Sequence, residues 1–216
     1  MGYYPLFLEL AGRACLVVGG GTVAQRKVEG LLEGGAEVTV VSPRLCKGLK
    51  TLAQQGHICA LTRRYRRGDL RGKTLVVAAT NDPQVNGQVA ADAQQQGILV
   101  NGVDRPELCS FIVPSVIRRG DLVLAISTGG KSPAVAKRLR RELETWLDSG
   151  PGQLLGLAAE VRQELRLRGQ RPSPSRWQKA LDAELMALVK NGKREEARVR
   201  LLSALGGTGA IAAAHG

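Results

Sequence analysis

The chain has 216 residues, enough for one well-buried domain and a smaller appended unit. Hydrophobic residues make up 44% and charged residues 23%, and no apolar run approaches the roughly 18 residues that a membrane span needs. The first residues, MGYYPLFLELAGR, have neither the basic start nor the small-residue cleavage site of a secretion signal. We therefore expect a cytoplasmic protein with no membrane partner.

A formal net charge of +12 arises from 31 Lys and Arg residues against 19 Asp and Glu residues. Such a chain attracts anions, and the anion could be nucleic acid, a membrane surface or a polyacidic small molecule. An aromatic content of 3% argues against the base-stacking platforms of single-strand binders. Of these anions we expect the small molecule, and no nucleic-acid partner.

The cysteines and histidines are not spaced as metal ligands. No C-x-x-C pair occurs, and neither histidine lies at a zinc-ligand spacing from a cysteine. We expect buried or unreactive thiols and no resident metal site. The residues concerned are Cys15, Cys46, Cys59, Cys109, His57 and His215.

The first half of the chain alternates apolar runs with helical periodicity. Residues 14–18, ACLVV, are followed by glycines, and residues 22–35 then carry apolar side chains at helical spacing. Pro83 suits the first turn of a second helix, which Gly97 would end. Strands alternating with helices imply an α/β fold with a parallel sheet and right-handed crossovers. The further strands are expected at 36–42, 73–80 and 97–103, with a less regular helix at 45–56 and a short strand at 58–64.

The pattern changes after Asp104. Residues 111–128 indicate two strands around a Gly120–Asp121 turn, so we place a domain boundary near Pro114. A strongly periodic helix follows, with Ser132 as its N-cap, and the sequence GPG ends it.

The remaining residues are helical in pattern and basic. About three amphipathic helices are expected over 153–205, with a break at 168–175, and residues 161–200 hold 11 basic and 5 acidic side chains. Residues 206–216 have too little apolar area to order themselves. We divide the chain into an α/β domain, a small α+β domain and a helical domain, at residues 1–113, 114–150 and 151–216.

Gly19, Gly21 and Ala24 fit the pattern G-x-G-x-x-A between a strand and a helix. At such a turn the backbone N–H groups and the helix dipole point at one spot suited to a pyrophosphate. The first glycine allows the tight turn, the second lets the backbone approach the phosphates, and the alanine keeps helix and strand close. A tight turn with no ligand is the alternative.

The residue that usually binds the ribose of NAD is an acid about 20 positions further on, at the end of the second strand. Here that strand ends with Ser42, Pro43 and Arg44. Ser42 could hydrogen-bond the ribose and Arg44 could favour a 2′-phosphate. The spacing alone leaves NAD and NADP open.

Two further groups of polar residues follow strands. Thr80, Asn81 and Asp82 lie at a strand's carboxyl end, where ligands of open α/β sheets bind, although Asn81 and Asp82 also suit a helix cap. Asp104 follows the next strand and could be a general base or, alternatively, an Asx-turn residue.

A second glycine-containing turn opens the helix that Ser132 caps. Its N-terminus could hold a substrate carboxylate, or the turn could serve only for capping. The turn contains Ser127, Thr128, Gly129, Gly130, Ser132 and Pro133.

Four linked motifs over about residues 3–147 resemble the precorrin-2 dehydrogenase/sirohydrochlorin ferrochelatase family, the amino-terminal module of sirohaem synthases. They are G-G-G-x-V-A-x-R-K, N-x-V-D, S-F-I-x-P-S and S-x-G-G-x-S-P. The resemblance implies a Rossmann domain, a small dimerisation domain and a helical tail, with the active site between domains of a homodimer. It also implies NAD-dependent oxidation of precorrin-2 to sirohydrochlorin and, in bifunctional members, insertion of Fe²⁺ to give sirohaem.

The resemblance also implies roles for individual residues. The family's catalytic aspartate matches Asp104, and its NAD contacts match the loop around Thr80 and, through the backbone, Pro43 and Arg44. The remaining NAD contacts fall on Gly19, Gly20, Gly21, Thr22 and Val23. Precorrin-2 is a polycarboxylate, so basic side chains near the cleft are candidates to hold it. These candidates are Arg118, Arg119, Lys131 and Lys137.

Three alternatives remain open. The protein could be a dehydrogenase without chelatase activity. It could be a nucleotide-sensing regulator whose basic helical tail binds DNA, although that tail shows no clear helix-turn-helix. It could be an NADP-linked reductase of small molecules, which only Arg44 favours.

Overall fold

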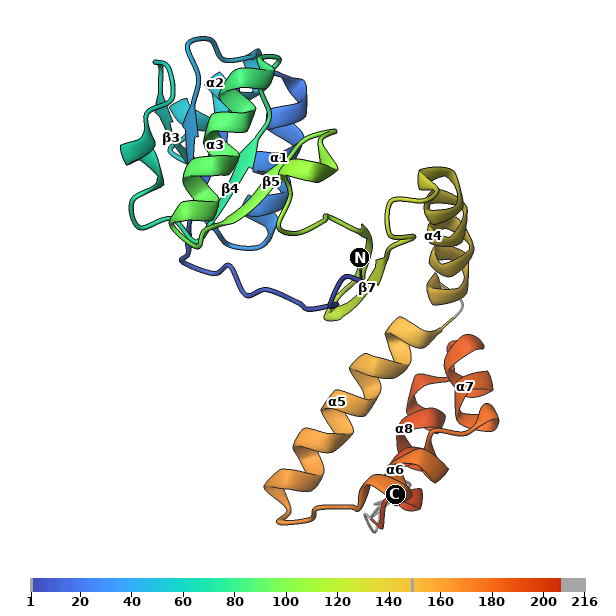
Figure 1. The fold of residues 1–216 in the computed structure, drawn as a ribbon. Helices are drawn as coiled ribbons and strands as arrows, with labels where there is room; N and C mark the ends of the chain where they lie inside the picture. Colours follow the sequence, from blue (N-terminus) through green and yellow to red (C-terminus); the bar gives the residue numbers. More distant parts are fainter. Residues whose placement is uncertain (1, 149, 207–216) are drawn as a thin grey trace. The chain divides into compact units, whose positions relative to one another are not determined.

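The computed structural model of the chain describes residues 2–148 and 150–206. The chain divides into two compact units, the first reaching Val113 and the second starting at Pro114. A parallel sheet with helices forms the first unit, and a hairpin with helices forms the second (Figure 1). This is the fold class expected from the sequence. The finer division of the second unit at residue 150 stays a prediction.

The first unit is an open sheet in the order β3-β2-β1-β4-β5, with every neighbouring pair parallel. The carboxyl ends of all its strands therefore meet at one edge, where open α/β sheets bind ligands. The strands are β1 (Ala14–Val18), β2 (Glu37–Val41), β3 (Ile58–Leu61), β4 (Leu75–Ala78) and β5 (Leu99–Gly102). The helices are α1 (Thr22–Glu33), α2 (Lys47–Gln54), α3 (Pro83–Gln95) and the 3₁₀ turns η1 (Arg67–Leu70) and η2 (Pro106–Leu108).

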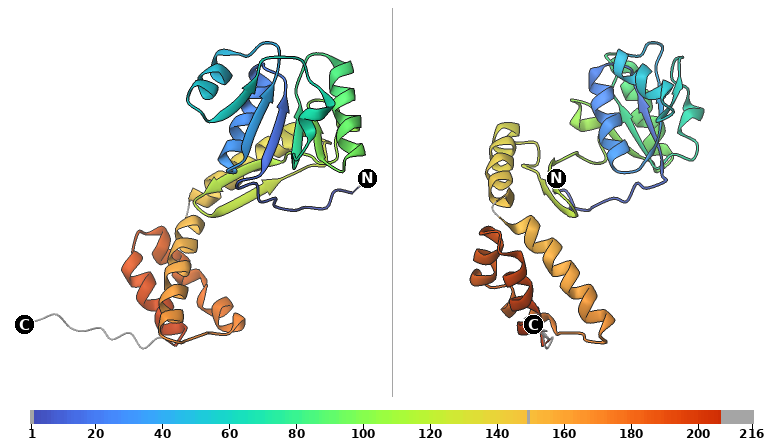
Figure 2. Two further views of the ribbon diagram at one scale, coloured as in Figure 1. Left: turned by 90° about the vertical axis from the view of Figure 1, so that its left-hand side faces the viewer. Right: turned by 180° about the vertical axis from the view of Figure 1, so that it is seen from behind.

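Two apolar cores cover the two faces of this sheet, because successive side chains of a strand point to opposite faces. Cys15 and Val17 of β1 pack in one core with buried residues of α1 and α2. Leu16 and Val18 pack in the other core with α3. The views in Figures 1 and 2 show helices on both sides of the sheet. The strands thus form a rigid frame for the loops at the carboxyl edge.

The second unit joins a two-stranded antiparallel sheet to helices. Strands β6 (Ser115–Arg119) and β7 (Leu122–Ile126) form the hairpin, which packs against α4 (Pro133–Asp148). A separate apolar core unites the last helices. These are α5 (Pro151–Leu167), α6 (Pro174–Ala180), α7 (Ala183–Lys190) and α8 (Arg194–Ala204).

The structure corrects two details of the sequence prediction. Strand β3 ends at Leu61 rather than at residue 64, and the described residues from Pro151 to 206 form four helices instead of about three. The extra helix arises because Asp182 starts a new helix, its carboxylate accepting a hydrogen bond of 2.8 Å from the N–H of Leu185. The tail expected to fray, residues 206–216, lies outside the described residues except for Gly206. No helix within residues 2–148 and 150–206 is both long and apolar enough to cross a membrane.

Candidate active site

Three consecutive glycines form the turn between β1 and α1. A Cβ on Gly19, which has a φ of +134°, would lie 2.2 Å from the carbonyl oxygen of Ala79. A Cβ on Gly20 would lie 1.9 Å from the carbonyl oxygen of Arg44. Gly21 is different, because a Cβ there would meet no atom within 4 Å. The turn is therefore closely packed at its first two glycines and open at the third.

Helix α1 begins at this open space. Its cap residue, Gly21, has no side chain that could cap the helix, and no acidic residue occupies the first turn. The first backbone N–H groups and the positive end of the helix dipole are therefore available to an anion. Ala24 is fully buried and lets the helix approach the sheet closely. This arrangement fits a pyrophosphate.

A cleft of about 820 Å³ lies at the carboxyl edge of the sheet, around this turn. The structure brings all the residues expected to bind the cofactor together in its lining. They are Gly19, Gly20, Gly21, Thr22, Val23, Ser42, Pro43, Arg44, Thr80, Asn81 and Asp82.

Ser42 holds the loop after β2 in place. Its side chain is buried, and its Oγ donates a hydrogen bond of 2.7 Å to the carbonyl oxygen of Arg44. The N–H of Cys46 donates to the carbonyl oxygen of Gly20 at 2.7 Å, which ties the same loop to the glycine turn. The hydroxyl hydrogen of Ser42 is thus committed to the loop, so a hydrogen bond to a ribose would have to be one that Ser42 accepts.

Thr80 is fixed by a side chain that the sequence analysis did not single out. The buried Asn86 accepts hydrogen bonds from the Thr80 Oγ1 and N–H at 2.8 and 3.2 Å, and its Nδ2 donates to the Thr80 carbonyl at 2.9 Å. Asp82 caps α3 by accepting hydrogen bonds from the N–H groups of Gln84 and Val85. The capping interpretation of Asp82 is therefore confirmed, while Asn81 is exposed in the cleft lining.

Two residues of the loop after β3, Arg64 and Tyr65, also line the cleft and were missed from the sequence. The Tyr65 hydroxyl donates a hydrogen bond of 3.1 Å to Asp92. Burial, with that hydrogen bond, raises the pKa of the Tyr65 hydroxyl, so it stays protonated at neutral pH. The basic run at residues 63–67 was the available signal, but only the sheet order shows that it reaches the cleft.

Asp104 stands at the same edge of the sheet as the cleft. Because Ala78 of β4 pairs with Gly102 of β5, Thr80 and Asp104 each lie two residues past a paired position. Asp104 is exposed and has a φ of 57°; no other residue apart from glycine has a positive φ within the described residues. Its carboxylate makes no hydrogen bond or ion pair there, so the alternative Asx-turn interpretation lacks its hydrogen bond.

The loop that carries Asp104 is closed by Cys109. The Cys109 thiol is shared between the carbonyl oxygens of Gly102 and Arg105, at 3.2 and 3.3 Å, on either side of Asp104. Burial raises the pKa of this thiol, which keeps it protonated and able to donate. Asn101 donates to the carbonyl oxygen of Phe111 at 3.1 Å and secures the far end of the loop.

Lys27, in the R-K pair of the first motif, lies close enough to Asp104 for their charges to interact. Burial lowers the pKa of the Lys27 ammonium and Arg26 lowers it further, whereas Cys109 and Asp104 act in the opposite direction. No role for Lys27 is predicted from the sequence. The structure makes it a half-buried cation beside the carboxylate that the motifs single out.

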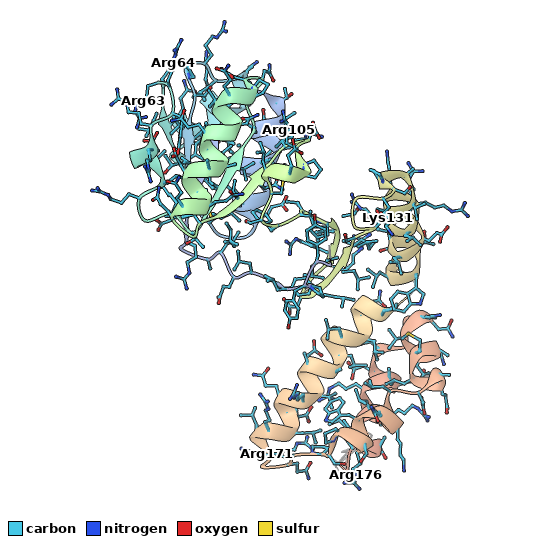
Figure 3. All side chains as sticks on the ribbon, viewed as in Figure 1. Arg63, Arg64, Arg105, Lys131, Arg171 and Arg176 are labelled. Atoms are coloured by element: carbon cyan, nitrogen blue, oxygen red, sulfur yellow. The ribbon has the colours of Figure 1, made fainter. Side chains whose placement is uncertain are left out.

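The residues expected to hold substrate carboxylates all belong to the second unit. Arg119 is engaged, because its guanidinium donates to Asp148 at 2.8 Å. Arg118 and Lys131 are exposed, and Figure 3 labels Lys131 just before α4. In the turn, the Gly129 N–H donates to Ser127 Oγ at 3.1 Å. Thr128 Oγ1 donates a hydrogen bond to the Ser132 carbonyl oxygen and accepts one from the Ser132 N–H. Ser132 Oγ accepts from the Val135 N–H. The capping role of Ser132 is confirmed, and the substrate roles stay predictions.

The part of the chain that the structure describes contains no set of side chains that could form a resident metal site. Within it, no three His, Cys, Asp or Glu residues are grouped so as to hold a metal ion. The described cysteines are all free thiols. The expectation that the protein has no resident metal site stays a prediction from the sequence.

The parallel sheet, the glycine turn and the cleft define a dinucleotide-binding protein of the Rossmann class. Comparison with known families agrees. The model described as "Putative NAD(P)-binding" matches residues 6–115, and the chain belongs to that family. The cofactor expected from the sequence, NAD, is confirmed by this match. A second model, "Sirohaem biosynthesis protein central", matches residues 119–145.

Individual relatives extend the likeness over almost the whole chain. A siroheme synthase of Nitrosococcus oceani is 41% identical over 209 residues, which are 96% of this chain and 45% of the relative. A siroheme synthase of Azotobacter vinelandii is 40% identical over 206 residues, 94% of this chain and 44% of the relative. The chain thus spans less than half the length of these curated relatives. The resemblance to the amino-terminal module of sirohaem synthases is confirmed.

A solved structure covers both units. The protein described as "SirC, precorrin-2 dehydrogenase" matches with a TM-score of 0.74 and 29% sequence identity. The match covers 93% of this chain and 100% of that chain.

Proposed function

We propose that this protein oxidises precorrin-2 to sirohydrochlorin with NAD⁺ as the hydride acceptor. One observation carries the proposal: a precorrin-2 dehydrogenase structure matches this chain over 93% of its length and over all of its own. The siroheme synthases among the relatives support the same tetrapyrrole substrate.

The cofactor cleft would bind NAD⁺. The open backbone at Gly21 and the start of α1 would hold the pyrophosphate. Thr80, which Asn86 holds in place, would line the part of the cleft at the ends of β4 and β5. When bound, NAD⁺ supplies the hydride acceptor. The protein contributes position and electrostatics.

Asp104 would accept the proton that leaves the substrate as the hydride departs. Its carboxylate is exposed, makes no hydrogen bond or ion pair within the described residues, and lies at the β5 end of the ligand-binding edge. A carboxylate in this position could take up a proton from a substrate bound at the same edge. Lys27, whose charge interacts with that of Asp104, would favour the approach of a substrate carboxylate.

Insertion of Fe²⁺ into sirohydrochlorin is a second candidate activity, favoured by the relatives that are described as siroheme synthases. Chelation removes the pyrrole N–H protons as the metal ion enters, and the same Asp104 could accept them. Fe²⁺ would then be a substrate rather than a resident ion.

The remaining partner expectations belong to this proposal. A homodimer is inferred from the resemblance alone. A cytoplasmic location is supported by the free thiols among the described cysteines, which suit a reducing compartment. The DNA-binding alternative is weakened because Arg194, Arg198 and Arg200 of the basic tail form ion pairs with carboxylates of the same unit.

The proposal predicts that anaerobic precorrin-2 and NAD⁺ yield sirohydrochlorin and NADH in equal amounts, because one hydride and one proton leave each substrate molecule. Absorbance spectra of the tetrapyrrole and of NADH would measure this directly. A chain that binds the dinucleotide but forms neither product would refute the oxidation. Loss of free Fe²⁺ and sirohydrochlorin at the same rate with and without protein would exclude chelation.

A further inference from the structure

We propose that the Lys27 ammonium binds one carboxylate of the tetrapyrrole directly and so aligns the reacting part of the ring with Asp104. The inference rests on the proposed function, because it concerns the substrate of that reaction. It assigns one contact to one side chain and makes Lys27 a specificity-determining residue outside the cofactor cleft.

Lys27 differs from the other lysines in its surroundings. Lys27 and Lys73 are half-buried, whereas the other lysines of the described residues are exposed. Lys73 has a partner, because its ammonium donates a hydrogen bond of 2.9 Å to Thr39 Oγ1. Lys27 makes no hydrogen bond or ion pair within residues 2–148 and 150–206. A half-buried ammonium in this state has lost part of its hydration and gained no bond in return, which a ligand carboxylate would offset.

The packing of α1 places Lys27 beside the loop that carries Asp104. Val28 of α1 is buried, and Val103 and Phe111, at the two ends of that loop, pack against the same core. Lys27 directly precedes Val28, and its charge interacts with that of Asp104. The ammonium and the carboxylate therefore lie near each other on adjoining elements.

The pair of charges is open. In the part of the chain that the structure describes, Lys27 and Asp104 interact at a distance but form no ion pair. Arg63 and Asp69 of the same unit, by contrast, are in contact at 2.6 Å. Opposite charges that lie near each other without contact can bind different parts of one ligand. A tetrapyrrole is such a ligand, because its carboxylates stand on a ring that also releases protons.

Lys27 adjoins the cofactor cleft but does not line it. Val23 of α1 belongs to the lining, and Lys27 follows it by one helical turn on the same side of the helix. Neither Lys27 nor Asp104 is among the described residues of the lining. A tetrapyrrole held by Lys27 would thus lie next to the dinucleotide, as hydride transfer requires, without sharing its contacts.

Binding of sirohydrochlorin to the full chain tests the inference without turnover, because oxidation leaves the carboxylates of the substrate in place. Anaerobic titrations would follow the absorbance of the tetrapyrrole. Lys27→Met should weaken sirohydrochlorin by about tenfold, the loss expected for one charge-assisted contact. Lys27→Arg should stay within about threefold of the unaltered chain, since a cation remains. The affinity for NAD⁺, measured by calorimetry, should be unchanged in both variants.

The melting temperature distinguishes a binding role from a structural one. Lys27→Met should melt at the same temperature as the unaltered chain or higher, because methionine removes a half-buried charge and keeps most of the side-chain volume. Lys50→Met is the matched control. Lys50 is exposed on α2 and is not among the described residues of the cleft lining. Its replacement changes the net charge equally and should leave binding and melting unchanged.

The pH dependence of binding gives a second readout. Burial lowers the pKa of the Lys27 ammonium and Arg26 acts in the same direction, while Cys109 and Asp104 oppose them. Lys27 therefore loses its charge at a lower pH than an exposed lysine, and sirohydrochlorin affinity should fall as the pH rises through that pKa. In Lys27→Arg the affinity should persist to higher pH, because a guanidinium stays charged. The Cys109 thiol titrates in both proteins, so the difference between them reports on Lys27.

Three results would overturn the inference. The first is equal sirohydrochlorin affinity in the unaltered chain and in Lys27→Met. The second is a lower melting temperature of Lys27→Met with matching losses for sirohydrochlorin and NAD⁺. The third is the same alkaline fall of affinity in Lys27→Arg as in the unaltered chain.

The outcomes also separate this inference from the proposed function. Sirohydrochlorin binding with the expected dependence on Lys27, but no oxidation of precorrin-2, would refute the proposed reaction and keep the contact. Oxidation by Lys27→Met with an unchanged KM for precorrin-2 would refute the contact and keep the reaction.

Discussion

Asp104 has a left-handed backbone conformation that side chains other than those of glycine, asparagine and aspartate seldom adopt. Strained residues of this kind concentrate where a side chain must be aimed. Here the residue in that conformation carries an exposed carboxylate that makes no hydrogen bond or ion pair among the described residues. A carboxylate held ready in this way suits proton transfer better than a structural turn.

Cys109 should act as a positioning residue for Asp104, because its thiol bridges the carbonyl groups on either side of it. We expect Cys109→Ala to lower kcat about tenfold, since small displacements of a catalytic group reduce the rate strongly. Cys109→Ser, which keeps a donor, should recover most of the loss. The KM for NAD⁺ should stay unchanged in both variants, as should the melting temperature of the serine variant. Equal kcat in all three proteins would show that the thiol does not position Asp104.

The sequence could predict Asp104 as a candidate but not the residues that hold it. A motif and a position after a strand were sufficient to select the aspartate. The bridging by Cys109 depends on a closed loop. Likewise, Asn86 contacts Thr80 from the first part of α3, six residues further along the chain. Such contacts depend on backbone geometry that spacing alone does not determine.

The glycine turn shows at the level of an element how one motif serves two purposes. Gly20 allows the loop after β2 to pack against the turn, while Gly21 leaves space for a ligand. The pattern G-x-G-x-x-A assigns no function to the middle position, which is why the structural role of Gly20 could not be predicted from it.

Gly20→Ala and Gly21→Ala should therefore differ. The first places a Cβ 1.9 Å from the Arg44 carbonyl oxygen and should destabilise the protein by about 1–3 kcal/mol, as overpacking does. The second meets no atom within 4 Å and should cost under about 1 kcal/mol, while weakening NAD⁺ binding roughly tenfold or more. Thermal unfolding and calorimetric titration would measure the two effects. A Gly21→Ala protein that binds NAD⁺ normally would show that the pyrophosphate lies elsewhere.

The order of strands and helices followed well from hydrophobic periodicity, because buried parallel strands form continuous apolar runs. The end of β3 and the number of terminal helices were less accurate. Arg63 continues the expected strand in composition, yet its side chain is engaged by Asp69 in the following turn. The separation of α6 from α7 depends on the cap at Asp182, a short signal inside a helical pattern.

In the molecule as a whole, some basic side chains are paired with carboxylates and others are free to bind a ligand. Many arginines of the second unit are paired with carboxylates, as in Arg119–Asp148 and Arg200–Asp182. Arg44 and Arg64, by contrast, are free among the described residues and line the cofactor cleft. The net charge of +12 predicted an anionic ligand but not where it would bind, since composition carries no information on pairing.

The residues assigned to the reaction are distributed over both units. The first contains the cleft and Asp104, and the second contains Arg118, Lys131 and the turn that includes Ser127 and Thr128. The structure describes each unit by itself, so the substrate roles of the second unit depend on the resemblance.

The role proposed for Asp104, acceptance of the proton in precorrin-2 oxidation, can be tested by single-turnover kinetics. Single-turnover oxidation of precorrin-2 by NAD⁺ would be compared under anaerobic conditions for the unaltered chain, Asp104→Asn and Glu33→Gln. Glu33 is an exposed carboxylate at the far end of α1, and its neutralisation is the matched control. We predict a loss of about a hundredfold or more for Asp104→Asn, the typical contribution of a general base, with unchanged NAD⁺ binding and no loss for Glu33→Gln. An Asp104→Asn protein as fast as the unaltered chain would show that Asp104 is not the proton acceptor.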